Sequence, residues 1–416
     1  MISIKKKDEV QQKAISAWLN SDKHGTCEII TGLGKTFVGL HALYTMPKDK
    51  NVVHYFLAEV VDRQRDLLAQ INKYNEIFNR NVLVDYNLQF ECYQTVYKWK
   101  GRRIGLVIAD EIHDSLTPAY SQFYKNNDFS AIIGLSALID VETYYEEENK
   151  TKGYYLSKVA PICYQYHLNQ GLEEGTARNL DIYIINHKLD DSVKSIKAGS
   201  ARKPFMQTEA KAYTYWDKVF KDNINAEINY NKKEGEDHKT YLKRIEKLEN
   251  QKSIKITSAA GRRSKILYDL PSKIEVTKQI IRKLTGKVII FGNSIDSLLQ
   301  VTKNTVSSRN SEAKNSQIRT AFDNNYIRVI GSFKKLKQGA NLKDLDACIL
   351  MSYYSKQKDL IQRLGRLREN GQIGKVFIIM TADTQEKVWV NKMFEQVQNY
   401  NFIYCTDVQD CLNKLN

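Results

Sequence analysis

What this sequence of 416 residues lacks narrows the classes of protein to which it can belong. No apolar run approaches the roughly 18–20 residues that a membrane span requires. The charged stretch Met1–Val10 has no apolar core of the kind that a signal peptide contains. We therefore expect no membrane partner and a cytoplasmic location, either in a bacterial cell or in a phage-infected host.

Closely spaced cysteines are also missing. The six cysteines form no Cys-x-x-Cys pair, and no histidines cluster near them. Zinc and iron–sulfur sites are usually built from such closely spaced ligands. The pattern argues against a metal site of this type and favours reduced cytosolic thiols.

Negative charge is in short supply as well. There are 63 Lys and Arg residues against 48 Asp and Glu, which gives a net charge of +15 and a pI near 9.2. Such an excess favours a polyanionic partner, usually nucleic acid, although a generally lysine-rich proteome would produce it too. The length allows two or three domains, and the 42% hydrophobic content is ordinary for a globular protein.

The most informative motif runs from Ile29 to Thr36 and reads Ile-Ile-Thr-Gly-Leu-Gly-Lys-Thr. An apolar run precedes it and a helical pattern follows, which is the order found around a phosphate-binding loop. The glycines let backbone N–H groups approach phosphate oxygens, and the N-terminus of the following helix favours the same anion. Ile29 stands where a further glycine is usual, and a Gly-Lys-Thr turn also arises by chance. We predict nucleotide binding by Thr31, Gly32, Leu33, Gly34, Lys35 and Thr36, with Lys35 on the β- and γ-phosphates and Thr36 on Mg²⁺.

A second motif, Leu106 to His113, is an apolar strand that ends in two carboxylates, Asp110 and Glu111. Such a pair at the C-terminal end of a parallel strand lies on the ligand face of the sheet. Asp110 can share the Mg²⁺ with Thr36, and Glu111 can orient the attacking water and take its proton. An acidic helix start after a buried strand is the alternative, and the upstream glycine loop makes it the weaker one.

Short apolar runs alternate with helical patterns in both the N-terminal and the C-terminal third, which predicts buried strands of parallel sheets. The expected strands are 27–31, 52–58, 104–109, 131–135, 287–292, 328–332, 347–352 and 376–381. The stretch from about 204 to 262 is polar, lysine-rich and helical in pattern. We therefore expect an α/β protein with two tandem parallel-sheet domains, 1–165 and 166–416, and a helical insertion at 204–262.

Together the two motifs resemble motifs I and II of superfamily 2 helicases of the DExH type, in which two RecA-like domains close on ATP. Other segments resemble further motifs of that family in the expected order. Gln11 resembles the glutamine that reads adenine, and Tyr93-Gln94-Thr95 resembles a segment before motif II in DNA-repair and phage members. Residues 134–138 resemble motif III, with Leu138 in place of its last hydroxyl residue.

In the C-terminal half, residues 288–294 resemble motif IV, 336–342 motif V and 362–368 motif VI. The resemblance implies that Arg366 crosses to the nucleotide as an arginine finger, while Glu369 stands where the family has a second arginine. The kind of member most resembled is the Xeroderma-group-B and branch-migration kind. Further nucleotide contacts implied by these motifs are Gly339, Asn341, Gln362 and Arg363, and the implied nucleic-acid contacts are Thr95, Ser332 and Lys334.

The resemblance implies an ATP- and Mg²⁺-dependent helicase or translocase that moves on nucleic acid, with DNA favoured over RNA and branched or forked duplex as the substrate. Three alternatives remain: an RNA helicase, the ATPase motor of a larger DNA-processing complex, and a nucleotide-dependent binding platform without turnover. We expect a monomer, with room for protein partners from replication or repair.

Overall fold

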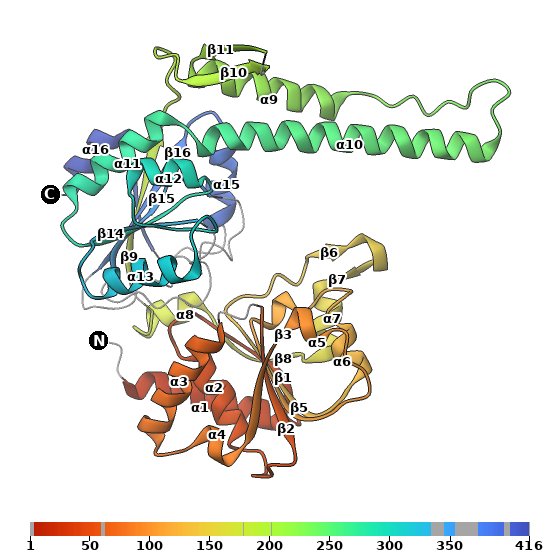
Figure 1. Ribbon diagram of the computed structural model, residues 1–416, viewed down its shortest axis with the longest axis vertical. Coiled ribbons are helices and arrows are strands. Elements are labelled where there is room, and N and C mark those ends of the chain that lie inside the picture. Colours follow the sequence, from red (N-terminus) through yellow and green to blue (C-terminus); the bar gives the residue numbers. More distant parts are fainter. Residues whose placement is uncertain are drawn as a thin grey trace.

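The computed structural model describes residues 4–59, 63–177, 179–200, 202–333, 345–353, 373–394 and 400–415. It contains two lobes, each built on a parallel sheet, and a long helical arm that leaves the second lobe (Figure 1). No helix among the described residues is both long enough and apolar enough to cross a membrane. The expected α/β class with two tandem parallel sheets is confirmed.

The N-terminal lobe is organised around a six-stranded sheet of order β3-β2-β4-β5-β1-β8. Its inner strands read as continuous apolar runs because both of their faces are buried. The strands are β1 (His24–Ile29), β2 (Val53–Ala58), β3 (Asn87–Cys92), β4 (Arg103–Asp110), β5 (Asp128–Ser136) and β8 (Ile162–Tyr166).

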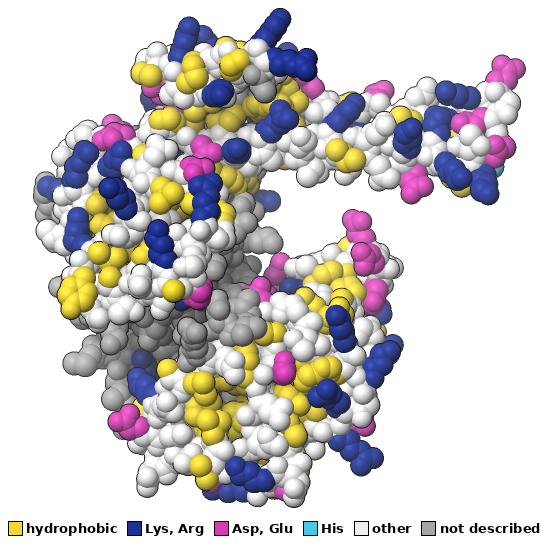
Figure 2. Space-filling view, viewed as in Figure 1, with side chains coloured by type: hydrophobic (Ala, Val, Ile, Leu, Met, Phe, Trp, Pro, Cys, Tyr) yellow, Lys and Arg dark blue, Asp and Glu magenta, His cyan; other side chains and the backbone are white. Residues whose placement is uncertain are grey.

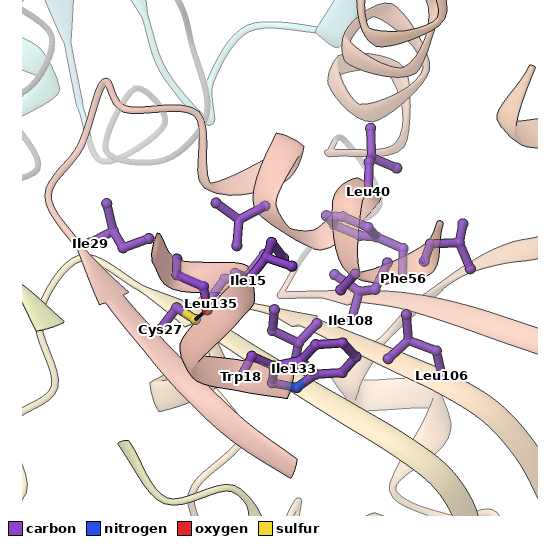
Figure 3. Close-up of a cluster of buried hydrophobic side chains, with 14 of the residues drawn as sticks. Ile15, Trp18, Cys27, Ile29, Leu40, Phe56, Leu106, Ile108, Ile133 and Leu135 are labelled. Atoms are coloured by element: carbon purple, nitrogen blue, oxygen red, sulfur yellow. Dashed lines mark hydrogen bonds between the residues drawn. The ribbon is translucent and has the colours of Figure 1, made fainter. Parts of the chain in front are cut away.

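Helices cover both faces of this sheet, so the lobe has three layers. In Figure 3, Ile15 and Trp18 of the first helix lie against Cys27 and Ile133 of the strands, and the Trp18 indole N–H donates to the Ile132 carbonyl at 2.7 Å. One face packs against α1 (Ile4–Asn20), α2 (Lys35–Leu43) and α3 (Arg63–Phe78), and the other against α5 (Tyr93–Val96), α6 (Gln122–Asn126) and α7 (Lys152–Val159).

The C-terminal lobe repeats this plan with a seven-stranded parallel sheet of order β13-β14-β12-β15-β16-β9-β17. Its strands are β9 (Leu180–His187), β12 (Lys287–Phe291), β13 (Thr305–Val306), β14 (Val329–Ser332), β15 (Leu345–Leu350), β16 (Gly374–Thr381) and β17 (Asn401–Cys405). Its two apolar faces pack against α11 (Pro271–Lys283), α12 (Ile295–Val301), α13 (Glu312–Asp323), α15 (Gln385–Phe394) and α16 (Val408–Asn413).

The remaining elements are short. The first lobe carries α4 (Val82–Asp85), the 3₁₀ turns η1 (Ile112–Asp114) and η2 (Glu146–Glu148), and a small hairpin of β6 (Tyr144–Tyr145) and β7 (Lys150–Thr151). Helix α8 (Leu168–Glu173) lies between β8 of the first sheet and β9 of the second in the sequence.

The arm consists of α9 (Glu209–Asn225) and α10 (His238–Tyr268) joined by residues 226–237, and it projects from the second lobe (Figure 1). Lys and Arg side chains recur along it and over the adjoining lobe in Figure 2. An antiparallel hairpin of β10 (Ile196–Ser200) and β11 (Lys203–Gln207), which the sequence pattern did not reveal, precedes α9.

Candidate active site

The glycine loop leads from the end of β1 into α2, and two of its residues take backbone angles that favour glycine. Gly32 has φ +97° and Gly34 has φ +81°, in the left-handed region where a side chain would be strained. Gly34 is the N-cap of α2, and its carbonyl accepts hydrogen bonds from the N–H groups of Phe37 and Val38. The loop therefore turns its backbone into a helix N-terminus, where anions bind.

Lys35 begins α2 and reaches back across the sheet edge. Its Nζ lies 3.4 Å from the carbonyl oxygen of Ile29 and 4.0 Å from Oε1 of Glu111. The two charged side chains are only 11% and 13% exposed. The ammonium group thus lies between the glycine loop and the acidic pair, at an ion-pair distance too long for a strong hydrogen bond.

The acidic pair lies at the end of β4. Asp110 is the last residue of the strand and is buried, while Glu111 adopts φ +49° and ψ 50°. A non-glycine residue in the left-handed region costs on the order of 1–3 kcal/mol and marks a turn that surrounding contacts must hold. The conformation turns the chain from β4 into η1 and places Glu111 beside Lys35.

Behind this turn, hydroxyl groups fix the backbone. The Tyr93 hydroxyl donates to the Asp110 carbonyl oxygen at 2.9 Å, and the Ser115 hydroxyl donates to the Ile112 carbonyl at 2.7 Å. Ser115 Oγ also lies 2.8 Å from the hydroxyl of Tyr124. All three side chains are buried, so these bonds face no competition from bulk water. Sequence reasoning noted Tyr93 only as part of a resemblance and missed Ser115 and Tyr124, whose hydroxyls carry no signal in the sequence.

The segment predicted as motif III contacts the acidic motif, Leu106 to His113, through His113. Nδ1 of His113 lies 2.7 Å from Ser136 Oγ, at the end of β5, which is the strand between β1 and β4. The Ser136 hydroxyl in turn donates to the Leu138 carbonyl at 3.1 Å. A backbone carbonyl at position 138 therefore serves in this contact, and the absent hydroxyl of Leu138 does not prevent it.

One carboxyl group beside the turn, that of Asp114, has a strongly shifted pKa. Burial, together with the carboxylates of Glu59 and Glu111, raises the pKa of Asp114 to about 8. Asp114 therefore holds a proton at neutral pH, and one of its oxygens lies 3.1 Å from His113 Nε2. On the other side of the imidazole, Oε2 of Glu111 lies 3.4 Å from Nδ1 but has no hydrogen-bond partner among the described residues.

Gln11, the expected adenine reader, lies on α1 and is buried against the glycine loop. Its Nε2 donates to the Leu33 carbonyl at 2.8 Å, and a Cβ added at Gly34 would come within 2.6 Å of this nitrogen. Its Oε1 has no hydrogen-bond partner among the described residues. The structure thus places Gln11 beside the loop, and its contact with adenine stays a prediction.

Glu28 is a residue of this region that sequence reasoning missed. It is buried on β1, where it accepts hydrogen bonds from the Ile139 N–H and from Gln165 Nε2, both at 2.9 Å. It ties the chain after motif III to β8. The available signal was a carboxylate inside an apolar strand one residue before the glycine loop.

The other predicted site residues differ in their exposure, and some of them lie outside the described residues. Thr31 and Thr36 are half-buried at the loop, Leu33 is buried, and Thr95 is exposed on α5. Ser332 ends β14 with a side chain only 1% exposed, so any contact with nucleic acid there requires its neighbours to move. Six predicted residues lie outside the described part of the chain: Lys334, Gly339, Asn341, Gln362, Arg363 and Arg366.

Two known protein families match the chain. Residues 4–141 match the family described as Type III restriction enzyme, res subunit, and residues 272–371 match the helicase conserved C-terminal domain. The chain is a superfamily 2 helicase or translocase. Members of this superfamily hydrolyse ATP and bind nucleic acid, and the two sheets are its tandem RecA-like domains.

Individual relatives agree with this assignment. The DNA 3'-5' translocase XPB2 of Sulfurisphaera tokodaii is 23% identical over 392 residues, which cover 91% of this chain and 82% of the relative. It agrees with the expected likeness to Xeroderma-group-B proteins. Neither this relative nor the two structures below is described as a phage protein, so the phage likeness stays a prediction.

Two solved structures share the fold. The ATP-dependent Type ISP restriction-modification enzyme LlaBIII bound to DNA has a TM-score of 0.58 and 13% identity, over 96% of this chain and 31% of that one. A single-substitution variant of S. cerevisiae Dbp5, bound to RNA and ADP BeF3, has a TM-score of 0.59 and 12% identity, over 98% and 91% of the two chains. This chain therefore spans about a third of the restriction–modification enzyme.

Proposed function

We propose that this superfamily 2 protein is an ATP-dependent DNA helicase or translocase that acts on branched or forked duplex in replication, recombination or repair. The observation that supports this best is the convergence of Lys35 and Glu111, 4.0 Å apart, where the glycine loop meets the end of β4. The DNA translocase among its relatives favours DNA over RNA as the track. The engine would consist of a first domain, 1–165, and a second, 166–416, with a helical insertion at 204–262.

The described residues fit a magnesium nucleotide. A Cβ built on Gly32 meets no atom within 4 Å, so a phosphate oxygen has room beside the backbone. Lys35 and Glu111 meet only at 4.0 Å, and Oε2 of Glu111, 3.4 Å from His113 Nδ1, makes no hydrogen bond with a described residue, so both groups can still contact a nucleotide and its metal. Thr36 and Asp110 would hold Mg²⁺, which when bound would neutralise charge on the phosphoryl group.

Each residue would then have one role. Lys35 would bind the β- and γ-phosphates, and Glu111 would orient the water and accept its proton. Gln11 would contact adenine through its free acceptor oxygen. Arg366 would stabilise charge on the transferring group from the second domain, with Gly339, Asn341, Gln362 and Arg363 as further contacts implied by resemblance. Nucleic acid would contact Thr95, Ser332 and Lys334, mainly through phosphates.

A single panel of substrates tests this function. Phosphate release and strand separation are measured with single-stranded, forked and four-way-junction DNA and with RNA of matched length. We expect DNA to stimulate ATP hydrolysis more than RNA, with the largest effect from branched duplex. Stronger stimulation by RNA would identify an RNA helicase, and an absence of hydrolysis would identify a binding platform. Light scattering on the same samples tests the expected monomer.

A second candidate function is the motor of a larger DNA-processing complex. Two observations favour it: the match of residues 4–141 to a restriction-enzyme subunit, and the span of only 31% of LlaBIII. In that case a separate polypeptide would copurify with the chain at fixed stoichiometry and change its preference among the DNA substrates. A preference that is unchanged by every copurifying protein would exclude this candidate.

A further inference from the structure

Helix α5 lies between two parts of the proposed motor. Tyr93 and Val96 point into the lobe and are buried, whereas Gln94 and Thr95 are exposed. The buried side therefore touches the core behind the acidic motif, and the exposed side carries Thr95, which is a proposed nucleic-acid contact. One short helix thus has one face toward each of the two sites.

A hydrogen bond links the buried side of α5 directly to the acidic pair. The Tyr93 hydroxyl donates to the backbone carbonyl of Asp110 at 2.9 Å, and the tyrosine side chain is 1% exposed. Burial raises the pKa of this phenol well above its ordinary value, so it remains a donor over the whole working pH range. The carbonyl that accepts this bond directly precedes Glu111.

The backbone at Glu111 is sensitive to that carbonyl. Because Glu111 has φ +49°, its peptide geometry is held by contacts on either side and not by its own preference. Rotation of the Asp110–Glu111 peptide would move the Glu111 carboxylate away from Lys35, which lies 4.0 Å from it. The donor on α5 is therefore placed to set the direction of the proposed water-orienting carboxylate.

We propose that Tyr93 is a positioning residue that couples nucleic acid bound on the exposed face of α5 to the orientation of Glu111. This inference rests on the proposed function. Nucleic acid on Gln94 and Thr95 holds α5 in the position that the structure shows, in which Tyr93 donates to the Asp110 carbonyl, so hydrolysis accelerates when the track is bound. A ligand shifts such an equilibrium only through contacts that differ between the two positions of the helix.

The test compares Tyr93→Phe with a matched variant, Tyr124→Phe. Both remove one buried phenolic hydroxyl from the same cluster. The Tyr124 hydroxyl contacts Ser115 and Tyr93, and of the two tyrosines Tyr93 alone donates to the Asp110 carbonyl. We expect Tyr93→Phe to reduce DNA-stimulated kcat by about tenfold, while the basal rate falls much less and KM for ATP stays as in the wild type. DNA affinity should fall as well, because the coupling between DNA binding and the Tyr93–Asp110 bond is reciprocal. Tyr124→Phe should keep its DNA stimulation.

Hydrogen exchange of the peptide 104–115 supplies a second readout, which does not depend on measuring turnover. DNA binding should slow exchange in this peptide in the wild type and in Tyr124→Phe, but not in Tyr93→Phe. Three results would each overturn the coupling: equal stimulation of Tyr93→Phe and wild type, equal losses in the two variants, or no effect of DNA on exchange in the wild type. A wild-type protein that no nucleic acid stimulates would instead overturn the proposed function.

Discussion

The two lobes each contain a lysine–glutamate pair beside the C-terminal ends of their strands, and the two pairs differ in almost every respect. In the first lobe, Lys35 and Glu111 are 4.0 Å apart and remain partly exposed. In the second lobe, Nζ of Lys273 lies 2.6 and 2.8 Å from the two carboxylate oxygens of Glu386, and the side chains are 1% and 0% exposed. The same chemistry thus occurs once as an open pair and once as a closed pair.

Both members of the closed pair, Lys273 and Glu386, make further hydrogen bonds besides the ones that join them. Glu386 also accepts the Thr381 N–H at 2.8 Å, and Lys273 also reaches the Leu267 carbonyl. Burial lowers the pKa of Lys273, and the Glu386 carboxylate opposes that shift. The pair joins α11, which follows the arm in the sequence, to α15, which follows β16. Its function is to hold helices together.

Neighbouring bonds fix the base of the arm to the same place. Arg263 of α10 pairs with Asp217 of α9 at 2.7 Å and reaches Gln385 of α15, whose N–H donates to the Tyr213 hydroxyl of α9. Glu209, the first residue of α9, accepts from the N–H and the hydroxyl of Ser272 in α11. The base of the arm is therefore anchored to the second lobe.

The open pair, Lys35 and Glu111, differs because its two charges are not in close contact. Because Lys35 and Glu111 lie 4.0 Å apart, neither closes off the other, and both would be able to contact the phosphates, metal and water of the proposed active site. A site that binds a charged ligand has to leave some of its own charges unsatisfied, whereas a structural pair has to satisfy them. The comparison predicts that mutating the open pair affects turnover and mutating the closed pair affects stability.

The largest effect is expected at the open pair. Lys35→Ala or Glu111→Gln should reduce ATP turnover by about 10²–10³-fold or more, because phosphate binding or water activation is lost. Thermal stability should change little, since the pair contributes little to the fold. Phosphate release and thermal melts measure the two quantities, with the exposed Lys48→Ala as control. Normal turnover in either variant would remove the pair from the active site.

The next effect is expected at the closed pair. Lys273→Met leaves Glu386 buried without its partner and should destabilise the protein by about 3–5 kcal/mol. The double variant Lys273→Met, Glu386→Leu should recover much of that loss, because no unpaired charge remains. Arg282→Ala breaks an exposed pair with Glu275 and should cost less than about 1 kcal/mol. Denaturant unfolding measures all three, and a single variant as stable as wild type would contradict the closed-pair interpretation.

The smallest effect concerns pH and the turn beside the open pair. The pKa of Asp114 is about 8 in the folded protein and near its ordinary low value in the unfolded chain. The folded state therefore binds the proton more tightly, and stability falls as pH rises toward 8. Between pH 6 and 8 the loss should be at most about 2–3 kcal/mol. Asp114→Asn cannot lose a proton and should flatten this slope, which melts at several pH values measure. An equal slope in both proteins would contradict the raised pKa.

Apolar patterning predicted much of the fold. All eight strands expected from apolar runs exist, because a strand buried on both faces has to be apolar along its length. The strands that were not expected include β3, β8, β13 and β17, which lie at sheet edges and carry weaker patterns. The interior strand β9 was also not expected, although its run Leu180–His187 is largely apolar and could have been recognised as a strand. The β10–β11 hairpin was missed because most of its residues are exposed and none is fully buried, so it has no apolar run.

At the site, the sequence identified the charged residues but not what holds them. Lys35, Asp110 and Glu111 stand in motifs whose spacing indicates their chemistry. The Tyr93 bond to a backbone carbonyl and the raised pKa of Asp114 depend on burial and on contacts between distant segments, which no local pattern reports. The roles of Gln11, Thr95 and Ser332 stay predictions.

The sequence by itself determined the class of engine, because phosphate binding requires glycines and a lysine at fixed spacing, and hydrolysis requires a carboxylate pair after a buried strand. Only the tertiary structure decided which of two lysine–glutamate pairs is open and which is closed. That distinction depends on how far each pair is removed from water and on which other groups satisfy its charges, and both are properties of the packed lobes.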